Sequence, residues 1–144
     1  MAEPAVFFVE DDAAVRKGCE QALALADIPV RGFADGEAML AALATATPAL
    51  VVSDVRLPGK DGLTLLRELR QYDRELPVLL ITGHGDVAMA VEAMREGAYD
   101  FIEKPFPSER LVAAVRSALE KRALIFENRQ LKERLGSATS QIIG

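Results

Sequence analysis

Five short apolar runs, each followed by a segment with helical spacing, constrain the fold of this chain most strongly. Short apolar runs bounded by turn signals are typical of strands buried on both faces, as in a parallel sheet. We expect strands over Ala5–Val9, Val30–Phe33, Leu50–Ser53, Pro77–Ile81 and Tyr99–Ile102. We expect helices over Asp12–Asp27, Glu37–Ala46, Leu63–Tyr72, about Asp86–Glu96, and from Ser108 onward.

This alternation predicts an α/β fold with a doubly wound, five-stranded parallel sheet, because right-handed crossovers place helices on both faces. The expected strand order is 2-1-3-4-5, as in flavodoxin-like folds. In that order the first and third strands are neighbours, and the chain reverses direction beside them. Ligands of open α/β sheets bind at the carboxyl edge near such a point.

Helix boundaries and buried faces follow from local signals. Pro48 should end the second helix, Gly97 stands where a C′ glycine is expected, and Ser108 is a good N-cap for the last helix. The apolar residues expected to face the sheet are Val15, Cys19, Leu23 and Ala26; Met39, Leu40 and Leu43; Leu65, Leu66 and Leu69; and Leu111, Val115, Ala118 and Leu119.

Composition excludes several classes of protein. The chain has 144 residues, 50% of them hydrophobic and 27% charged, which fits one globular domain rather than a disordered tail. A net charge of −5 argues against direct nucleic-acid contact. The single cysteine, Cys19, has no disulfide partner, which suits a reducing compartment. No stretch is long enough to span a membrane, so we expect a cytoplasmic protein.

Polar residues stand where the expected strands end. Glu10 and Asp11 follow the first strand, Asp54 follows the third, Thr82 follows the fourth and Lys104 follows the fifth. The predicted topology brings them to one edge of the sheet. Taken alone, Asp54 has a simpler explanation, because an aspartate before a turn is often only a cap.

The chemistry of this set points to phosphoryl transfer. Close carboxylates repel one another by roughly 1–4 kcal/mol per pair, and a hard divalent cation such as Mg²⁺ relieves that repulsion. Lys104 would add a second positive charge, and the Thr82 hydroxyl would add a hydrogen-bond donor. Beside these groups Asp54 is equipped as a carboxylate nucleophile that forms an aspartyl phosphate.

Four motifs, FFVEDD, SDVRLPGKDG, LLITGHGD and DFIEKPF, resemble the receiver domain of bacterial response regulators in order and spacing. The resemblance covers about residues 4–120. It implies that Asp54 is the phosphoacceptor, that Lys104 contacts the phosphoryl group, and that the bond from Lys104 to Pro105 is cis. It also implies that a sensor histidine kinase supplies the phosphoryl group and that the domain is not an enzyme.

The resemblance also assigns a magnesium site and a switch. Asp11, Asp54 and the main-chain carbonyl of Arg56 would hold Mg²⁺, with Glu10 in the outer shell. Asp12 is a third acid where the family has two, so it is either a further metal residue or the cap of the following helix. His84 lies in the loop after Thr82, where it could position water for hydrolysis of the acyl phosphate.

On phosphorylation, Thr82 would move toward the phosphoryl group and Phe101 would rotate inward. The face formed by residues 86–96, the fifth strand and the last helix would then change shape, as a shift between two populated packings. Without the resemblance, Phe101 would be read as an ordinary core residue.

The C-terminal segment predicts an output. No Gly or Pro occurs from Ser108 to Leu135, and Leu124, Asn128, Leu131 and Leu135 have coiled-coil spacing with a polar residue at an a position. A single amphipathic helix is the alternative. We therefore divide the chain into a receiver domain, 1–121, and a helical linker, 122–144, and expect a homodimer through the switch face and the last helix.

The linker sequence ENRQLKERL, followed by IIG, resembles the junction in NtrC-type, sigma-54-dependent transcription activators. This implies that an AAA+ ATPase and a DNA-binding domain follow in a longer protein. Phosphorylation would either release the ATPase domains or assemble their ring. Of the two we expect release, with the linker holding the ATPase domains apart until the receiver is phosphorylated.

Two other classes of protein fit parts of the pattern. Phosphatases of the haloacid dehalogenase type also use an aspartyl nucleophile after a strand, but they need a second Asp where this chain has Arg56. A flavodoxin-like cofactor binder needs a phosphate-binding loop after the first strand, where this chain has acids that would repel phosphate. A receiver that only dimerises would lack key residues, and none is missing.

Overall fold

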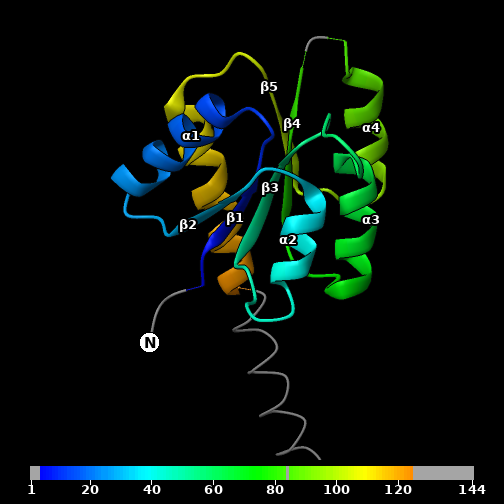
Figure 1. Ribbon diagram of the computed structural model, residues 1–144, viewed down its shortest axis with the longest axis horizontal. Helices are drawn as coiled ribbons and strands as arrows, with labels where there is room; N and C mark the ends of the chain where they lie inside the picture. The colour runs from blue at the N-terminus through cyan, green and yellow to red at the C-terminus, as the bar shows by residue number, and fades with distance from the viewer. Residues whose placement is uncertain (1–3, 84, 125–144) are drawn as a thin grey trace, which may run out of the picture.

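The computed structural model describes residues 4–83 and 85–124, which form one five-stranded sheet between two layers of helices (Figure 1). The strands are β1 (Val6–Val9), β2 (Val30–Phe33), β3 (Leu50–Asp54), β4 (Val78–Thr82) and β5 (Asp100–Glu103). The helices are α1 (Ala13–Leu25), α2 (Gly36–Ala42), α3 (Gly62–Tyr72) and α4 (Val87–Arg95). A further helix, called the C-terminal helix below, covers residues 108–124.

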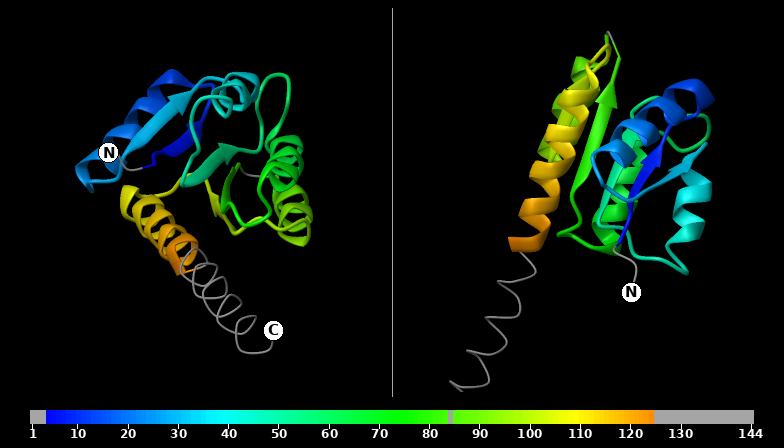
Figure 2. Two further views of the ribbon diagram at one scale, coloured as in Figure 1. Left: turned by 90° about the horizontal axis from the view of Figure 1, so that it is seen from below. Right: turned by 90° about the vertical axis from the view of Figure 1, so that its left-hand side faces the viewer.

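The strand order is β2-β1-β3-β4-β5, and all neighbouring strands are parallel. Val9 lies opposite Ser53, so the residues after β1 and at the end of β3 leave the sheet at the same edge. In Figures 1 and 2, α1 and the C-terminal helix cover one face, whereas α2, α3 and α4 cover the other. The predicted doubly wound fold and strand order are therefore confirmed.

Two apolar cores fill the space between the sheet and its helical layers. Under α2, α3 and α4 the core contains Met39, Leu65, Leu66 and Leu69, all completely buried. Under α1 and the C-terminal helix it contains Cys19, Leu23, Leu111, Val115 and Ala118. Leu40, Leu43, Val15, Ala26 and Leu119 are partly buried against these cores. Helical spacing therefore identified the buried faces of α1, α2, α3 and the C-terminal helix correctly.

Most element boundaries differ from the sequence-based expectation by one or two residues. β3, β4 and β5 each end one residue later than predicted, so Asp54, Thr82 and Glu103 are their last residues. The last helix begins at Ser108 itself, which was expected at its N-cap. Gly97 follows α4 with a φ of 107°, which confirms its place as a C′ glycine.

The largest correction concerns α2, which ends at Ala42 and not at Ala46. The main-chain N–H groups of Leu43, Ala44 and Thr45 each donate to the carbonyl three residues earlier, at 3.1–3.2 Å. Such bonds tighten the end of a helix into a turn, and the β-branched threonines on either side of Ala46 do not favour a further helical turn.

The described part of the C-terminal helix reaches Leu124. The predicted coiled-coil positions Asn128, Leu131 and Leu135 lie outside the described residues. Within the described residues, no helix combines the length and the apolar character needed to cross a membrane.

Candidate functional site

The carboxyl ends of β1 and β3 bring three acids together. Glu10 and Asp11 follow β1 directly, and Asp54 ends β3. One carboxylate oxygen from each acid lies within 4.8 Å of the other two. Glu10 and Asp54 are buried, with exposed fractions of 2% and 6%, whereas Asp11 is exposed. The predicted convergence at this edge of the sheet is present in the structure.

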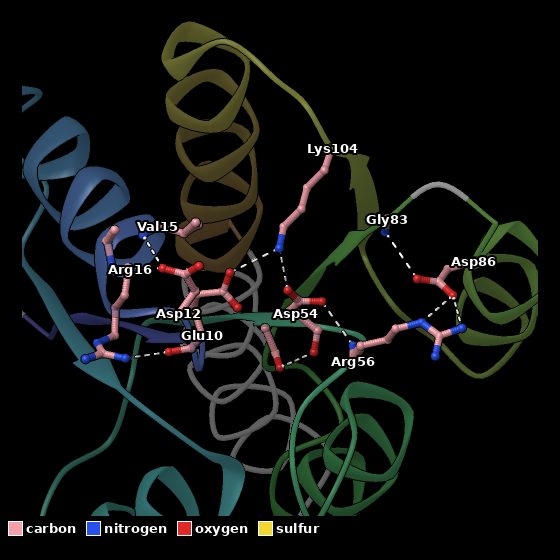
Figure 3. A network of polar contacts seen from close by, with 11 residues as sticks. Glu10, Asp12, Val15, Arg16, Asp54, Arg56, Gly83, Asp86 and Lys104 are labelled. Atoms are coloured by element: carbon pink, nitrogen blue, oxygen red, sulfur yellow. Dashed lines mark hydrogen bonds and ion pairs between the residues drawn. The ribbon is translucent and has the colours of Figure 1, made fainter.

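Lys104 reaches these acids from the end of β5 (Figure 3). Its Nζ lies 3.0 Å from Oε1 of Glu10 and 2.6 Å from Oδ2 of Asp54. Since β4 lies between β3 and β5, the lysine side chain passes the end of β4 to make these contacts. The Lys104 N–H also donates to the carbonyl of Thr82 at 2.7 Å. The peptide bond to Pro105 is cis, as the resemblance implied.

The protonation states of these groups depend on one another. Burial raises the pKa of the Glu10 carboxyl to about 7, hydrogen bonding with Asp54 acts in the same direction, and Lys104 opposes both. Burial alone would lower the pKa of Lys104, but its hydrogen bonds to Asp54 and Glu10 outweigh burial and raise that pKa above its ordinary value. One ammonium group therefore contacts two of the three acids, which leaves the cluster with an excess of negative charge.

The donor atoms suit a hard divalent cation. Oε2 of Glu10 is buried and has no hydrogen-bond partner among the described residues. Buried polar atoms nearly always have a partner, so this oxygen favours a ligand that the protein alone does not supply. Carboxylate oxygens on one exposed and two buried residues match the preference of Mg²⁺ for oxygen ligands and retained water. The residues present therefore fit a magnesium ion.

The loop after β3 is held close to the end of its own strand. The Arg56 N–H donates to Oδ1 of Asp54 at 3.0 Å, which fixes the carboxylate from the side opposite Lys104. The Gly62 N–H donates to the carbonyl of Val55 at 2.9 Å. A Cβ at Gly62 would come within 2.7 Å of the Asp54 carbonyl oxygen and 2.8 Å of the Val55 Cα. Only glycine allows this close approach of α3 to the site.

The two expected switch residues lie on neighbouring strands. Thr82 ends β4 and is buried. Asp54 lies opposite Ile81 in the parallel pairing, so Thr82 is one residue beyond it at the same edge. Phe101, on β5, is half-buried against the core under α2, α3 and α4.

The third acid of the EDD motif has a structural role. Oδ1 of Asp12 accepts hydrogen bonds from the N–H groups of Ala14 and Val15 at 2.9 and 3.1 Å, and so caps α1. The cluster of potential metal-ligand atoms contains Glu10, Asp11 and Asp54 but not Asp12. His84, which was expected to position water near the site, lies outside the described residues.

One contact of the site was not predicted, and it joins Arg56 to Asp86. Nε and Nη2 of Arg56 lie 2.8 and 2.7 Å from Oδ1 of Asp86, which belongs to the loop after β4. The sequence pointed to Arg56 for its carbonyl and as the residue in place of a phosphatase aspartate, and to Asp86 only as the start of a helix. An ion pair between residues 30 positions apart depends on how the two loops pack, and no local pattern signals it.

Comparison with known proteins gives the family. Residues 6–116 match the family described as the response regulator receiver domain. The chain is 47% identical over 138 residues to the C4-dicarboxylate transport transcriptional regulatory protein DctD of Rhizobium meliloti, covering 96% of this chain and 30% of that protein. It is 39% identical over 139 residues to the DNA-binding transcriptional regulator NtrC of Escherichia coli, covering 96% and 29%.

Solved structures agree. The crystal structure of NtrX from Brucella abortus in complex with ADP aligns with a TM-score of 0.84 and 39% identity, covering 90% of this chain and 30% of that one. The chain thus spans about a third of the length of these relatives. The predicted resemblance to NtrC-type regulators is confirmed, and DctD is one of the relatives found.

Proposed function

The chain belongs to the response regulator receiver family, and from this premise we propose that Asp54 accepts a phosphoryl group from a sensor histidine kinase. One observation carries the proposal. The buried Asp54 carboxylate lies beside two further acids and 2.6 Å from the ammonium group of Lys104, at the carboxyl edge of the sheet.

In the proposed step, one carboxylate oxygen of Asp54 attacks the phosphorus atom of a phosphohistidine. A P–O bond forms, the P–N bond breaks, and its electron pair stays with the imidazole of the kinase. Lys104 is placed to balance charge on the phosphoryl oxygens, because its Nζ already contacts Asp54. The Arg56 N–H orients the nucleophile from the other side.

Mg²⁺ would be held by Asp11, Asp54 and the Arg56 carbonyl, with Glu10 in the outer shell. When bound, it would neutralise acids at the site and charge on the phosphoryl oxygens. The unpartnered oxygen of Glu10 supports this assignment, because a cation or its water would satisfy that oxygen.

The signal would pass from Asp54 to β4 and β5. A phosphoryl group brings nearly two negative charges, and the Thr82 hydroxyl, one residue beyond the position opposite Asp54, would donate to it. Phe101 would then turn further into the core against which it already packs. The surface of α4, β5 and the C-terminal helix would change with it.

The output we propose is control of a sigma-54-dependent AAA+ activator, through a receiver over residues 1–121 and a helical linker over 122–144. The relationship to DctD and NtrC supports this class of output. Phosphorylation would alter a homodimer formed through the switch face and the C-terminal helix, and so release the ATPase domains.

A phosphatase of the haloacid dehalogenase type is a poorer fit. Its acid/base aspartate would stand at Arg56, whose guanidinium is paired with Asp86 and stays protonated near neutral pH, so it cannot act as a general base. The proposed role of the domain is therefore to accept a phosphoryl group rather than to turn over phosphoesters.

Phosphorylation by acetyl phosphate with Mg²⁺, followed by intact-protein mass spectrometry, tests the assignment. We expect wild type to gain one phosphoryl group and Asp54→Asn to gain none. Asp61→Asn is the matched control, because Asp61 caps α3 and an asparagine keeps the cap. Full labelling of Asp54→Asn, or no labelling of wild type, would reject Asp54 as the phosphoacceptor.

A further inference from the structure

Four helices in the described part of the chain have an aspartate at the N-cap, and one of these aspartates does not cap. Asp12, Asp35 and Asp61 each accept a hydrogen bond from a main-chain N–H in the first turn of α1, α2 and α3, at 2.8–3.1 Å. Asp86 stands at the same position of α4 and makes no such bond. An aspartate is among the strongest N-cap residues, so the exception requires a competing partner.

The competing partner is Arg56. Both guanidinium contacts go to Oδ1 of Asp86, and the Gly83 N–H donates to Oδ2 at 3.3 Å (Figure 3). Only 3% of the Asp86 side chain is exposed. Hydrogen bonding to Arg56 lowers the pKa of Asp86, so the carboxylate is charged at neutral pH. Both oxygens of the potential cap are thus committed to the loops beside the site.

Arg56 is also tied to the phosphoacceptor. It stands two residues after Asp54, and its N–H donates to the Asp54 carboxylate. Its side chain is 75% exposed, so the guanidinium is free to change partner without leaving a buried space. A phosphoryl group on Asp54 would offer it nearly two negative charges in place of the single charge of Asp86.

We propose that Arg56 withholds Asp86 from the N-terminus of α4, and that phosphorylation of Asp54 draws Arg56 away so that Asp86 caps the helix. This exchange rests on the proposed function of Asp54. It gives α4 two discrete arrangements, which is what a switch requires.

The exchange of partners changes the contacts of only one end of α4. At the far end, Arg67 of α3 holds Glu96 through two hydrogen bonds of 2.7 and 3.0 Å. Release of Asp86 therefore detaches the first turn of α4 from the loop after β3 and lets the aspartate cap that turn, while the last turn stays bound to α3. Val87 and Val91, which are exposed on α4, move with the freed end.

Amide hydrogen exchange at Ala88 and Met89, measured by NMR, tests whether Asp86 changes partner. The side chain of an N-cap residue accepts hydrogen bonds from the N–H groups at these two positions of the first turn. In unphosphorylated protein, Arg56→Ala leaves the main chain at Asp54 intact but frees Asp86. We expect exchange at one or both amides to slow about fivefold, the effect of a cap of ordinary strength. The double variant R56A/D86A should lose this slowing, and R56A/D86S should keep it because serine also caps.

Arg67→Ala is the matched control, since it removes an equivalent arginine–carboxylate pair at the other end of the same helix. It should leave exchange at Ala88 and Met89 unchanged. Wild type phosphorylated with acetyl phosphate should show the same slowing as unphosphorylated R56A.

Unchanged or faster exchange in R56A, or equal slowing in R56A and R67A, would overturn the withheld cap. Unchanged exchange in fully phosphorylated wild type would overturn the proposed trigger. If wild type takes up no phosphoryl group, the proposed function fails instead, and the comparison of R56A with R56A/D86A still decides whether the cap is withheld.

Discussion

The two ends of the sheet solve opposite electrostatic problems. At the carboxyl end, Glu10 and Asp54 are buried together and share one ammonium group. At the amino end, Arg122 of the C-terminal helix pairs with Asp73 at 2.7 Å, with about a fifth of each side chain exposed. Like charges are thus concentrated at one end, whereas a pair of opposite charges joins two elements at the other.

The amino end also fastens the C-terminal helix to the body of the domain. The hydroxyl groups of Tyr99 and Ser117 are hydrogen-bonded at 2.7 Å, and the Lys121 ammonium lies 5.1 Å from the centre of the Tyr99 ring. These contacts stabilise a fixed arrangement, whereas an acidic cluster is stable only when something binds. The difference predicts that perturbations at the carboxyl end change chemistry and ion dependence, while those at the amino end change stability slightly.

The largest expected effect is that of Lys104→Ala. Removing a hydrogen-bond donor that stabilises developing charge typically lowers a rate by about 10²–10³-fold. Phosphorylation by acetyl phosphate should therefore slow by about that factor. Lys121→Ala, which removes a lysine at the amino end, should leave the rate unchanged. Initial rates of phosphoryl uptake by mass spectrometry give both values, and equal rates for the two variants would remove the distinction between the ends.

The next effect is a loss of stability as pH rises, which bound Mg²⁺ should counteract. The pKa of Glu10 rises from 4.5 to about 7 on folding, so the folded state binds more protons than the unfolded state between these values. This contribution is fully present below pH 4.5 and is lost as pH rises through 7. At about 1.4 kcal/mol per unit it is at most about 3 kcal/mol.

Urea unfolding at a series of pH values in EDTA should therefore show that the free energy of unfolding falls as pH rises from 4.5 to about 7. Glu10→Gln should remove this pH dependence. Millimolar Mg²⁺ should stabilise wild type most at pH 7 and above, where protons do not compete for the acids. A midpoint unaffected by Mg²⁺ at every pH would contradict the metal site.

Gly62→Ala should destabilise the fold by about 1–3 kcal/mol, as overpacking usually does. The added Cβ would press on main-chain atoms of Asp54 and Val55, which cannot move without disturbing the site. Gly18→Ala in α1 is the control, because an added Cβ would meet no atom within 4 Å apart from its own stretch of helix, and it should stabilise by about 0.5–1 kcal/mol. Chemical denaturation measures both, and a neutral Gly62→Ala would show that the loop can relax.

The smallest effect is expected for Arg122→Ala at the amino end. Ion pairs near the surface contribute about 0.2–1 kcal/mol, and salt reduces that contribution. Thermal unfolding at low and high salt should show a small loss that shrinks as salt increases, with phosphoryl uptake unchanged. A loss of uptake in this variant would mean that the two ends are coupled.

Much of this fold could be predicted from the sequence because the relevant signals are local. Apolar runs and helical spacing depend on neighbouring residues, and the strand order then follows from crossover handedness. The same topology brought Glu10, Asp11, Asp54 and Lys104 to one edge before any distance was known.

What could not be predicted depends on competition between local and distant partners. Asp86 reads as an N-cap as clearly as Asp61 does, yet Arg56 takes its carboxylate. The EDD motif contains three acids of one type, and only the geometry separates Asp12, which caps α1, from the two acids beside Asp54. The early end of α2 depends on weak residue propensities, and helical spacing alone therefore predicted a helix that is too long.

The span of Lys104 across β4 has a consequence for whatever binds the domain from outside. The ammonium that contacts Asp54 is attached directly after β5, so the position of this edge strand and the occupancy of the acidic pocket are not independent. Thermodynamic linkage runs in both directions. Suppose that ligand binding in the acidic pocket raises the affinity of a partner for the β5 side by some factor. The bound partner must then raise the affinity of the pocket for its ligand by the same factor. A titration of Mg²⁺ with and without the partner would therefore report on output without any measurement of transcription.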